Sequence, residues 1–247
     1  MKITILPGIN KDRVKEGFDR IDLSPGDTVS IVGNTGSGKS AFINDIEVLA
    51  QNDTITCRRV LIDDKVPSEE MVRNPAMKPI AMITQNTRII ADLTVAEFIS
   101  HHARARQTQG NLVEETIDLA NKFTGEKVVG TSKISSLSGG QTKAILIADA
   151  LAISRTPILL LDEVENAGIY KDRFISLLKQ FEKTVIFVTH NPLLSLITNF
   201  RIVMKNGGVD RVLTPGDSEA RAVCTLKLID SYLMDCREKI RNGELIQ

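Results

Sequence analysis

The amino-acid sequence predicts an α/β fold built around a parallel sheet. Three short apolar runs have the length and composition of buried strands, at 27–32, 157–161 and 184–188. Continuous apolar runs of this kind are typical of parallel strands that are covered on both faces. Between the last two runs, residues 173–182 have the apolar spacing of a crossover helix. With 247 residues, 42% of them hydrophobic, the chain can form one structural unit with a sizeable core.

A long middle segment is predicted to form a helical subdomain. Residues 89–136 contain no comparable strand run, and their apolar side chains recur at helical spacing. We therefore expect this segment to be inserted into a discontinuous core made of residues 1–88 and 137–215.

The end of the chain is predicted to form a hairpin and then a helix. Two apolar segments flank Gly207 and Gly208 within residues 200–214, which indicates a hairpin. Residues 216–247 then carry a helix over about 218–241. Apolar side chains share one face of this helix, so we expect it to pack on the core through Val223, Leu226, Ile229, Leu233 and Ile240.

Charge, hydropathy and cysteine usage exclude several classes of protein. The 31 Lys and Arg residues balance 31 Asp and Glu residues, so no basic field draws the chain onto nucleic acid, which we do not expect as a partner. No apolar run approaches the roughly 20 residues that span a bilayer, and Pro7 and Gly8 interrupt the start too early for a signal peptide. Cys57, Cys224 and Cys236 form no CxxC pair, which favours reduced thiols. We expect a cytoplasmic protein, including one held peripherally at the inner face of a membrane.

A glycine-rich loop follows the first strand run. The stretch from Gly33 to Ser40 fits the pattern GxxxxGK[ST] and leads directly into a helical segment, which is the context that gives this motif meaning. Glycines let backbone N–H groups curl around phosphate oxygens, and the start of the helix adds partial positive charge. Lys39 is placed to reach the β and γ phosphates of a nucleotide, and Ser40 to ligate Mg²⁺. The residues expected to bind the nucleotide are Gly33, Asn34, Thr35, Gly36, Ser37, Gly38, Lys39, Ser40 and Ala41.

Two carboxylates follow the second strand run. Asp162 and Glu163 come directly after residues 157–161, and α/β sheets bind ligands at the carboxyl ends of their strands. We expect Asp162 to hold Mg²⁺ through water and Glu163 to polarise the attacking water. Acidic residues at the end of a strand are common, and a structural cap is the alternative. The glycine-rich loop favours the catalytic interpretation.

The pentapeptide from Leu137 to Gln141 distinguishes the chain from other proteins with such a loop. It reads LSGGQ, precedes a helix expected over 142–153 and lies upstream of the acidic strand. Ser138 is a good N-cap, and the two glycines expose backbone N–H groups at a helix start, so a second anion-binding element is expected. In sequence and in order, these motifs resemble those of the ATP-binding cassette (ABC) ATPases over about residues 18–213.

The resemblance implies an ATPase that binds MgATP and hydrolyses it. The expected fold is an α/β P-loop NTPase with an ABC-type, RecA-like core, an antiparallel β portion and the inserted helical subdomain. The resemblance also implies a head-to-tail dimer, formed with a second copy of the chain or with another ABC subunit. In such a dimer the signature loop of one protomer covers the γ-phosphate held by the other. The signature residues expected to contact ATP are Ser138, Gly139, Gly140 and Gln141.

Two further positions match the family. Gln85 ends the strand-like run of residues 81–85 and resembles the Q-loop residue, which would contact Mg²⁺ or the attacking water. His190 follows residues 184–188 and resembles the switch histidine, which would contact the γ-phosphate and keep the water in line. The resemblance therefore assigns catalytic roles to Glu163, His190 and Gln85, and Mg²⁺ contacts to Ser40, Gln85 and Asp162.

Base recognition departs from the family pattern. Family members usually stack adenine on an aromatic residue some way before the glycine loop, whereas Phe18 is the only aromatic residue upstream of Gly33. A stacked base is worth roughly 1–3 kcal/mol by analogy with single-strand binding. We therefore expect the base to be read loosely, unless Phe18 reads it.

Other departures bear on the biological role. The loop after Glu163 has Asn166 in place of the usual serine and Ile169 in place of the usual aspartate, with Glu165 or Asp172 as the candidates to substitute, so coupling between the two ATP sites is expected to differ. Asp149 stands where transporters commonly carry arginine. The adjacent histidines, His101 and His102, lack a functional context and are expected on the solvated surface.

These departures favour an ABC ATPase that drives conformational work on an unidentified soluble protein. The alternative is the ATP-binding subunit of a membrane transporter whose membrane subunit is a separate chain. Residues 88–92 border the groove between Gln85 and the helical subdomain, where Ile89 and Ile90 would suit a helix from either partner.

Overall fold

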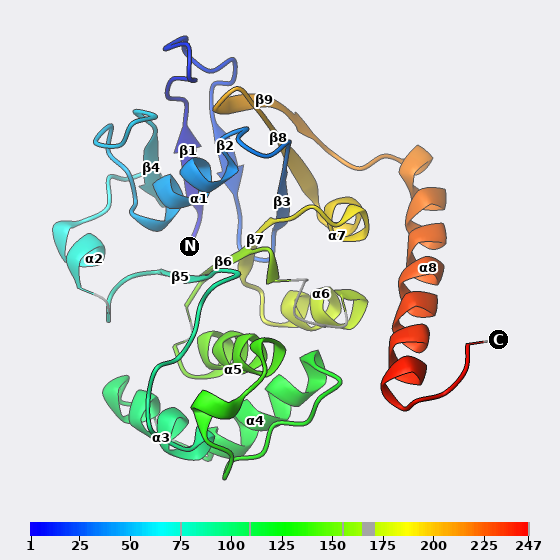
Figure 1. The fold of residues 1–247 in the computed structure, drawn as a ribbon. Coiled ribbons are helices and arrows are strands. Elements are labelled where there is room, and N and C mark those ends of the chain that lie inside the picture. The colour runs from blue at the N-terminus through cyan, green and yellow to red at the C-terminus, as the bar shows by residue number, and fades with distance from the viewer. Residues whose placement is uncertain (75, 109, 155, 165–170, 247) are drawn as a thin grey trace.

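The main sheet is parallel apart from one antiparallel hairpin at its edge. The structure is a computed structural model that describes residues 1–246 apart from 75, 109, 155 and 165–170. In Figure 1 the sheet runs through the middle of the molecule, with helices on both sides. The predicted parallel sheet, its three strand runs and the hairpin are confirmed. The strand order is β5 (Ile80–Ile83), β6 (Ile158–Asp162), β7 (Thr184–Val188), β3 (Thr28–Val32), β8 (Phe200–Lys205) and β9 (Gly208–Leu213).

The antiparallel β portion is a separate three-stranded sheet. Its order is β2 (Ile21–Leu23), β1 (Ile3–Leu6) and β4 (Arg59–Ile62). This sheet, helix α1 (Lys39–Glu47) and the main sheet share one hydrophobic cluster. Ile5, Phe42 and Ile186 come from these three elements and are fully buried, so the cluster fixes α1 relative to the end of β3. The short helix α2 (Glu69–Arg73) follows β4 and has no buried residue.

The helical half contains α3 (Val95–Ala105), α4 (Leu112–Phe123) and the short 3-10 helix η1 (Ile134–Ser136). Among the described residues of the segment 89–136, no strand is formed beyond an isolated bridge. Helix α5 (Gly139–Ala152) packs against α4 and shares a second hydrophobic cluster with it, with α6 (Lys171–Gln180) and with β6 and β7. Helix α5 therefore belongs to the helical half as much as to the core, although a boundary was expected before it.

A chain of buried aromatic rings connects the helical half to the sheet. Phe123 of α4 meets Phe174 of α6 edge-on, with ring centroids 5.2 Å apart. Phe174 in turn meets Phe187 of β7, with centroids 6.1 Å apart. Such contacts stabilise beyond their buried area, so the two halves are packed as one body at this point.

The C-terminal helix differs from the sequence expectation. Helix α8 (Asp217–Arg241) has the predicted extent, but none of its residues is buried. Its first turns line an open cavity of about 550 Å³ together with α6 and α7 (Pro192–Ile197), and the rest stands at the side of the molecule (Figure 1). Ile229, Leu233 and Ile240, expected on the core, remain 48%, 48% and 62% exposed. Within the described part of the chain, no helix is both long and apolar enough to cross a membrane.

Candidate functional site

Four predicted motifs lie along one edge of the main sheet. Strands β5, β6, β7 and β3 are parallel neighbours in that order, so their carboxyl ends are aligned. Gln85 follows β5, Asp162 ends β6, His190 follows β7, and the glycine loop follows β3. The Glu163 N–H donates to the Val188 carbonyl at 2.9 Å, which joins the ends of β6 and β7. The carboxyl edge of a parallel sheet is where α/β proteins bind ligands.

The glycine loop is seated on the turn between β8 and β9. Gly38 has φ 103°, and a Cβ there would lie 2.7 Å from the Gly207 Cα, so only glycine fits. The Gly207 N–H donates to the Ser37 carbonyl at 2.8 Å. At Gly36, by contrast, an added Cβ would meet nothing within 4 Å. The loop is therefore supported from behind and open at its tip.

Lys39 and Ser40 occupy the positions that the motif predicts at the start of α1. Lys39 is 8% exposed, and its Nζ donates to the carbonyls of Gly33 at 2.8 Å and Asn34 at 3.1 Å, so the ammonium arches across the loop. Ser40 is exposed. The Ser37 Oγ is buried and has no hydrogen-bond partner. Ammonium, hydroxyl and backbone N–H groups together form the donor set that phosphate requires.

The carboxylate of Glu163 faces His190. Glu163 Oε1 lies 3.5 Å from His190 Nε2, and both side chains are partly exposed. Glu163 has φ 51°, a left-handed conformation that is uncommon outside glycine. A carboxylate and an imidazole thus stand side by side at the strand ends, next to Asp162. The expectations for Glu165, Asn166 and Ile169, and for the side chain of Asp172, lie outside the described residues.

Gln85 lies in a turn rather than at the strand end itself. Strand β5 ends at Ile83, and Gln85 is exposed. The Thr84 N–H donates to Thr87 Oγ1 at 2.8 Å, which closes the turn. The chain then continues to α3, so Gln85 marks the connection between the sheet and the helical half.

The LSGGQ segment starts α5 with a capping box. Ser138 Oγ accepts from the Gln141 N–H at 3.2 Å, and Gln141 Oε1 accepts from the Ser138 N–H at 2.9 Å. Helix α5 begins at Gly139, three residues earlier than predicted, so both glycines lie in its first turn. A Cβ at Gly139 would meet nothing within 4 Å, which leaves this helix start open. Figure 1 places α5 and α1 in different halves of the molecule.

A buried ionic cluster behind the glycine loop was not predicted. Arg58 pairs with Glu16 at 2.7 Å and with Asp45 at 2.8 Å, and all three side chains are at most 2% exposed. Arg58 also donates to the Gly207 carbonyl at 3.0 Å and lies 4.9 Å over the Phe42 ring. Burial alone would lower the pKa of Arg58, but the two carboxylates raise it, so the guanidinium stays charged. One residue could have pointed to this cluster from the sequence: Asp45 is a carboxylate among the buried, mostly apolar residues of α1.

No aromatic ring lies in the segment that adjoins the glycine loop from the N-terminal side. Lys11 donates from Nζ to the Gly36 carbonyl at 2.7 Å, which places residues 8–16 beside the loop. Phe18 instead packs against the hydrophobic cluster of the antiparallel sheet. Phe18 is therefore a poor candidate for base recognition, and loose reading of the base stays a prediction.

His102 is not the solvated residue that the sequence suggested. Its Nδ1 lies 2.6 Å from Asp149 Oδ1, and the Asp149 side chain is 7% exposed. The His102 ring is also 6.4 Å from the ring of Phe98. This pair connects α3 to α5, whereas His101 is exposed as expected. Asp149 thus has a structural partner at a position where transporters commonly carry arginine.

The fold and the row of motifs at the sheet edge define a P-loop ATPase. The profile of the ABC transporter family matches residues 19–166. An uncharacterized ABC transporter ATP-binding protein of Methanocaldococcus jannaschii is 43% identical over 244 residues, which cover 98% of this chain and 94% of that protein. The chain belongs to the ABC transporter family, as a single ATP-binding cassette that hydrolyses ATP.

More distant relatives carry names of transport proteins. The nitrate import ATP-binding protein NrtC of Synechococcus elongatus is 28% identical over 197 residues. The aligned residues cover 76% of this chain and 28% of that protein. The sulfoquinovosyl glycerol transport ATP-binding protein SmoE of Agrobacterium fabrum is 27% identical over 83% of this chain, which spans 57% of that protein. The chain is therefore much shorter than these two relatives.

Solved structures support the fold. A dimeric ATP-binding cassette in a post-hydrolysis state with ADP and Pi has a TM-score of 0.64 at 25% identity, covering 86% of this chain and 98% of that one. The cbiO1 protein of Clostridium perfringens, part of the ABC transporter complex cbiONQ, has a TM-score of 0.67 at 20% identity. The match covers 95% of this chain and 98% of that one. The second likeness concerns the fold alone.

Proposed function

We propose that this chain is the ATP-binding subunit of a membrane ABC transporter. The observation that carries the proposal is the 43% identity, over 98% of the chain, to a protein named as an ABC transporter ATP-binding protein. The names of other relatives, for nitrate import and sulfoquinovosyl glycerol transport, point the same way. These names favour transport over the soluble role that the sequence alone favoured. They differ in cargo, so we assign none.

The proposed ATP site follows from the donor groups at the sheet edge. Lys39 and the loop N–H groups hold the phosphates, while Ser40, Asp162 and Gln85 supply oxygens for Mg²⁺. No group of three or more His, Cys, Asp or Glu in the described residues could hold a metal by itself. This donor set suits Mg²⁺, which usually relies on one or two protein ligands together with substrate phosphates. The ion would neutralise phosphate charge.

The hydrolytic roles go to the pair at the ends of β6 and β7. Glu163 polarises the attacking water and accepts its proton, and His190, 3.5 Å away, keeps the carboxylate and the water in line. The open helix start at Ser138 completes the site from a second protomer, because the α1 and α5 helix starts of one chain lie in different halves (Figure 1). We therefore propose an ATP-dependent head-to-tail dimer at the inner face of the membrane.

The proposed contact with a membrane subunit is the segment 88–92. This segment joins β5 to α3, between the sheet and the helical half. Ile90 is 96% exposed and Ile89 is partly buried, so an apolar side chain is presented at this connection. A short helix of a partner chain could cover it.

A pull-down from native membranes and cytosol tests this role. The Glu163→Gln chain, which binds ATP and stalls, serves as bait, alone and with Ile90→Asp or Ile55→Asp added. Ile55 is 89% exposed and lies elsewhere, so it controls for the loss of an exposed isoleucine. We expect a multi-spanning membrane protein with the parent and with Ile55→Asp, and its loss with Ile90→Asp. Recovery of soluble partners alone would contradict the transporter proposal.

A further inference from the structure

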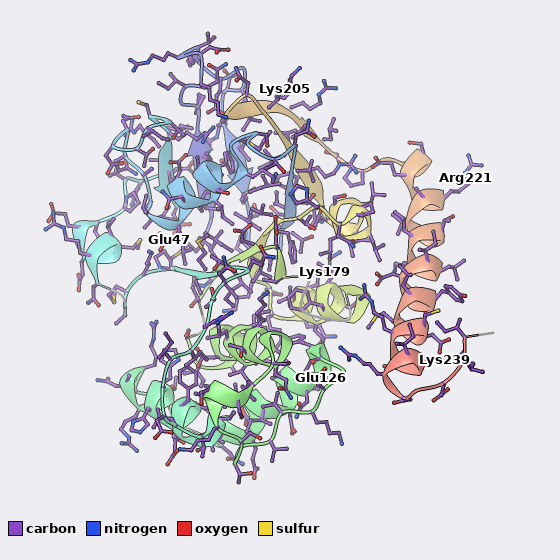
Figure 2. All side chains as sticks on the ribbon, viewed as in Figure 1. Glu47, Glu126, Lys179, Lys205, Arg221 and Lys239 are labelled. Atoms are coloured by element: carbon purple, nitrogen blue, oxygen red, sulfur yellow. The ribbon has the colours of Figure 1, made fainter. Side chains whose placement is uncertain are left out.

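Glu126 lies between the signature serine and the end of the C-terminal helix. Its Oε2 accepts a hydrogen bond from Ser138 Oγ at 3.0 Å. Its Oε1 lies 3.3 Å from Arg241 Nη1, at the last residue of α8. Figure 2 shows Glu126 on the side of the helical half that faces the end of α8, where Lys239 is labelled. Three segments distant in sequence thus meet at one carboxylate.

The hydroxyl of Ser138 has a single proton, and its hydrogen bond to Glu126 uses that proton. The Ser138 Oγ also accepts from the Gln141 N–H, so one of its two lone pairs and its only proton are engaged. A serine in this arrangement cannot donate to a phosphate oxygen. For Ser138 to donate to the γ-phosphate of a partner's ATP, the bond to Glu126 must break.

Charge opposes the same step. The Glu126 side chain is 45% exposed and lies within hydrogen-bond distance of the serine that would face the phosphate. A carboxylate beside a triphosphate is repelled, and water and salt screen that repulsion in part. Arg241 pairs with the other oxygen of the Glu126 carboxylate, so it can hold that carboxylate as the carboxylate turns away from Ser138. Lys239, two residues before, instead pairs with Asp235 at 2.9 Å.

We propose that Glu126 is a positioning residue that keeps Ser138 from ATP until Arg241 draws it aside. The end of α8 would thereby set the ATP concentration at which two protomers close. This inference rests on the proposed head-to-tail dimer. It assigns a role to a helix that contributes no residue to the buried core.

The test measures ATP-dependent dimerisation by analytical ultracentrifugation in the Glu163→Gln background. We expect Glu126→Ala to lower the ATP midpoint about tenfold and Arg241→Ala to raise it about two- to threefold, since exposed ion pairs contribute little. The double variant should behave as Glu126→Ala, because Arg241 acts only through Glu126. Glu115→Ala on α4 and Arg237→Ala on α8 are the matched controls for charge, and we expect both to keep the parent midpoint.

Two readouts separate this role from a structural one. In the otherwise wild-type chain, Glu126→Ala should lower the KM for ATP and leave kcat within about twofold, and its effect should shrink with added salt. A Glu126→Ala midpoint equal to or above the parent value would overturn the inference while leaving the dimer intact. If the Glu163→Gln parent itself stays monomeric with saturating ATP, the proposed dimer fails instead.

Discussion

Individual side chains at the sheet edge divide ATP binding from ATP hydrolysis. Lys39 is held against the loop carbonyls that surround the phosphate position. Glu163 and His190 stand at neighbouring strand ends and face each other. In the proposed function, the first residue acts on the phosphates that are bound, and the other two act on the water that attacks. Their removal should have different consequences.

Lys39→Ala should lose nucleotide affinity, whereas Glu163→Gln should keep it and stall. A charged hydrogen bond is worth about 1.5–3 kcal/mol, so the first change should weaken ATP binding about ten- to a hundredfold. Removing a general base typically slows the reaction by roughly 10²–10⁴-fold. Equilibrium titration with ATP and steady-state hydrolysis rates measure the two effects. Wild-type turnover by Glu163→Gln would refute the assignment of the base.

GTP should compete appreciably with ATP. The segment beside the glycine loop offers Lys11 but no ring, and the partly buried Phe18 packs against the antiparallel sheet, so we expect base stacking worth roughly 1–3 kcal/mol to be missing. We expect the two affinities to agree within about tenfold, because the triphosphate contacts dominate. Competition of both nucleotides against a fluorescent ATP analogue measures the ratio. A preference of a hundredfold or more would show that another group reads the base.

Residues in short motifs were predictable because their chemistry follows from local spacing. The GxxxxGK[ST] loop and the LSGGQ cap form local backbone structures, and the structure has both helix starts. Arg58, His102 and Glu126 could not be found in this way. Each acts through a partner at least a dozen residues away, so its role exists only once the chain is folded.

Helices and strands were predicted best where their sequence pattern has a single physical explanation. The runs of β6 and β7 are apolar along their length because both faces of a parallel strand are covered. Helical spacing correctly predicted the extent of α8. Periodicity identifies which side chains share a face of a helix, but it does not show which part of the protein packs against that face. Of the five side chains expected to pack on the core, Val223 and Leu226 are half-buried, whereas Ile229, Leu233 and Ile240 are exposed. The short antiparallel strands carry a weaker sequence pattern, and charged side chains flank them at the surface.

The antiparallel sheet should lose stability in mild acid through Asp22. Hydrogen bonds from Arg20 and Thr4 lower the pKa of Asp22 to about 2, from an ordinary value of 3.8. A lowered pKa stabilises the fold above the unfolded value, and this contribution disappears as the pH falls from about 4 towards 2. Urea midpoints at about pH 5 and pH 3 should therefore differ less in Asp22→Asn than in the parent.

Asp19→Asn is the control for this pH dependence, since Asp19 is exposed and lies three residues before Asp22, just ahead of β2. Solvent screening keeps the expected difference modest, because the Asp22 side chain is 38% exposed. An Asp22→Asn protein that loses as much stability between the two pH values as the parent would contradict the assignment.

The whole molecule presents the two proposed half-sites in different halves of the fold. The glycine loop, Glu163 and His190 belong to the sheet edge, and the open start of α5 belongs to the helical half (Figure 1). In a head-to-tail dimer, the sheet-edge half-site of each protomer would face the start of α5 of the other protomer, which gives two complete sites. Defects in different half-sites should then complement each other in a mixed dimer, and defects in the same half-site should not.

Mixing Lys39→Ala with Ser138→Arg should restore hydrolysis. Each mixed dimer would contain one intact site, so random pairing predicts about a quarter of the wild-type rate if the two sites act independently. Lys39→Ala mixed with Glu163→Gln is the matched control, because both changes fall in the same half-site and leave no intact site. Steady-state phosphate release measures both mixtures. Equal, background rates in the two mixtures would contradict independent head-to-tail sites.

The backbone at Glu163 implies a trade-off between stability and activity. Its φ of 51° costs on the order of 1 kcal/mol for a side chain other than glycine or asparagine. Stability alone would favour one of those two residues there, and the proposed role of the carboxylate gives a reason for glutamate at this position. A related cassette with glycine or asparagine at this position would have relaxed that constraint. Such a substitution would mark a chain that binds nucleotide without turning it over.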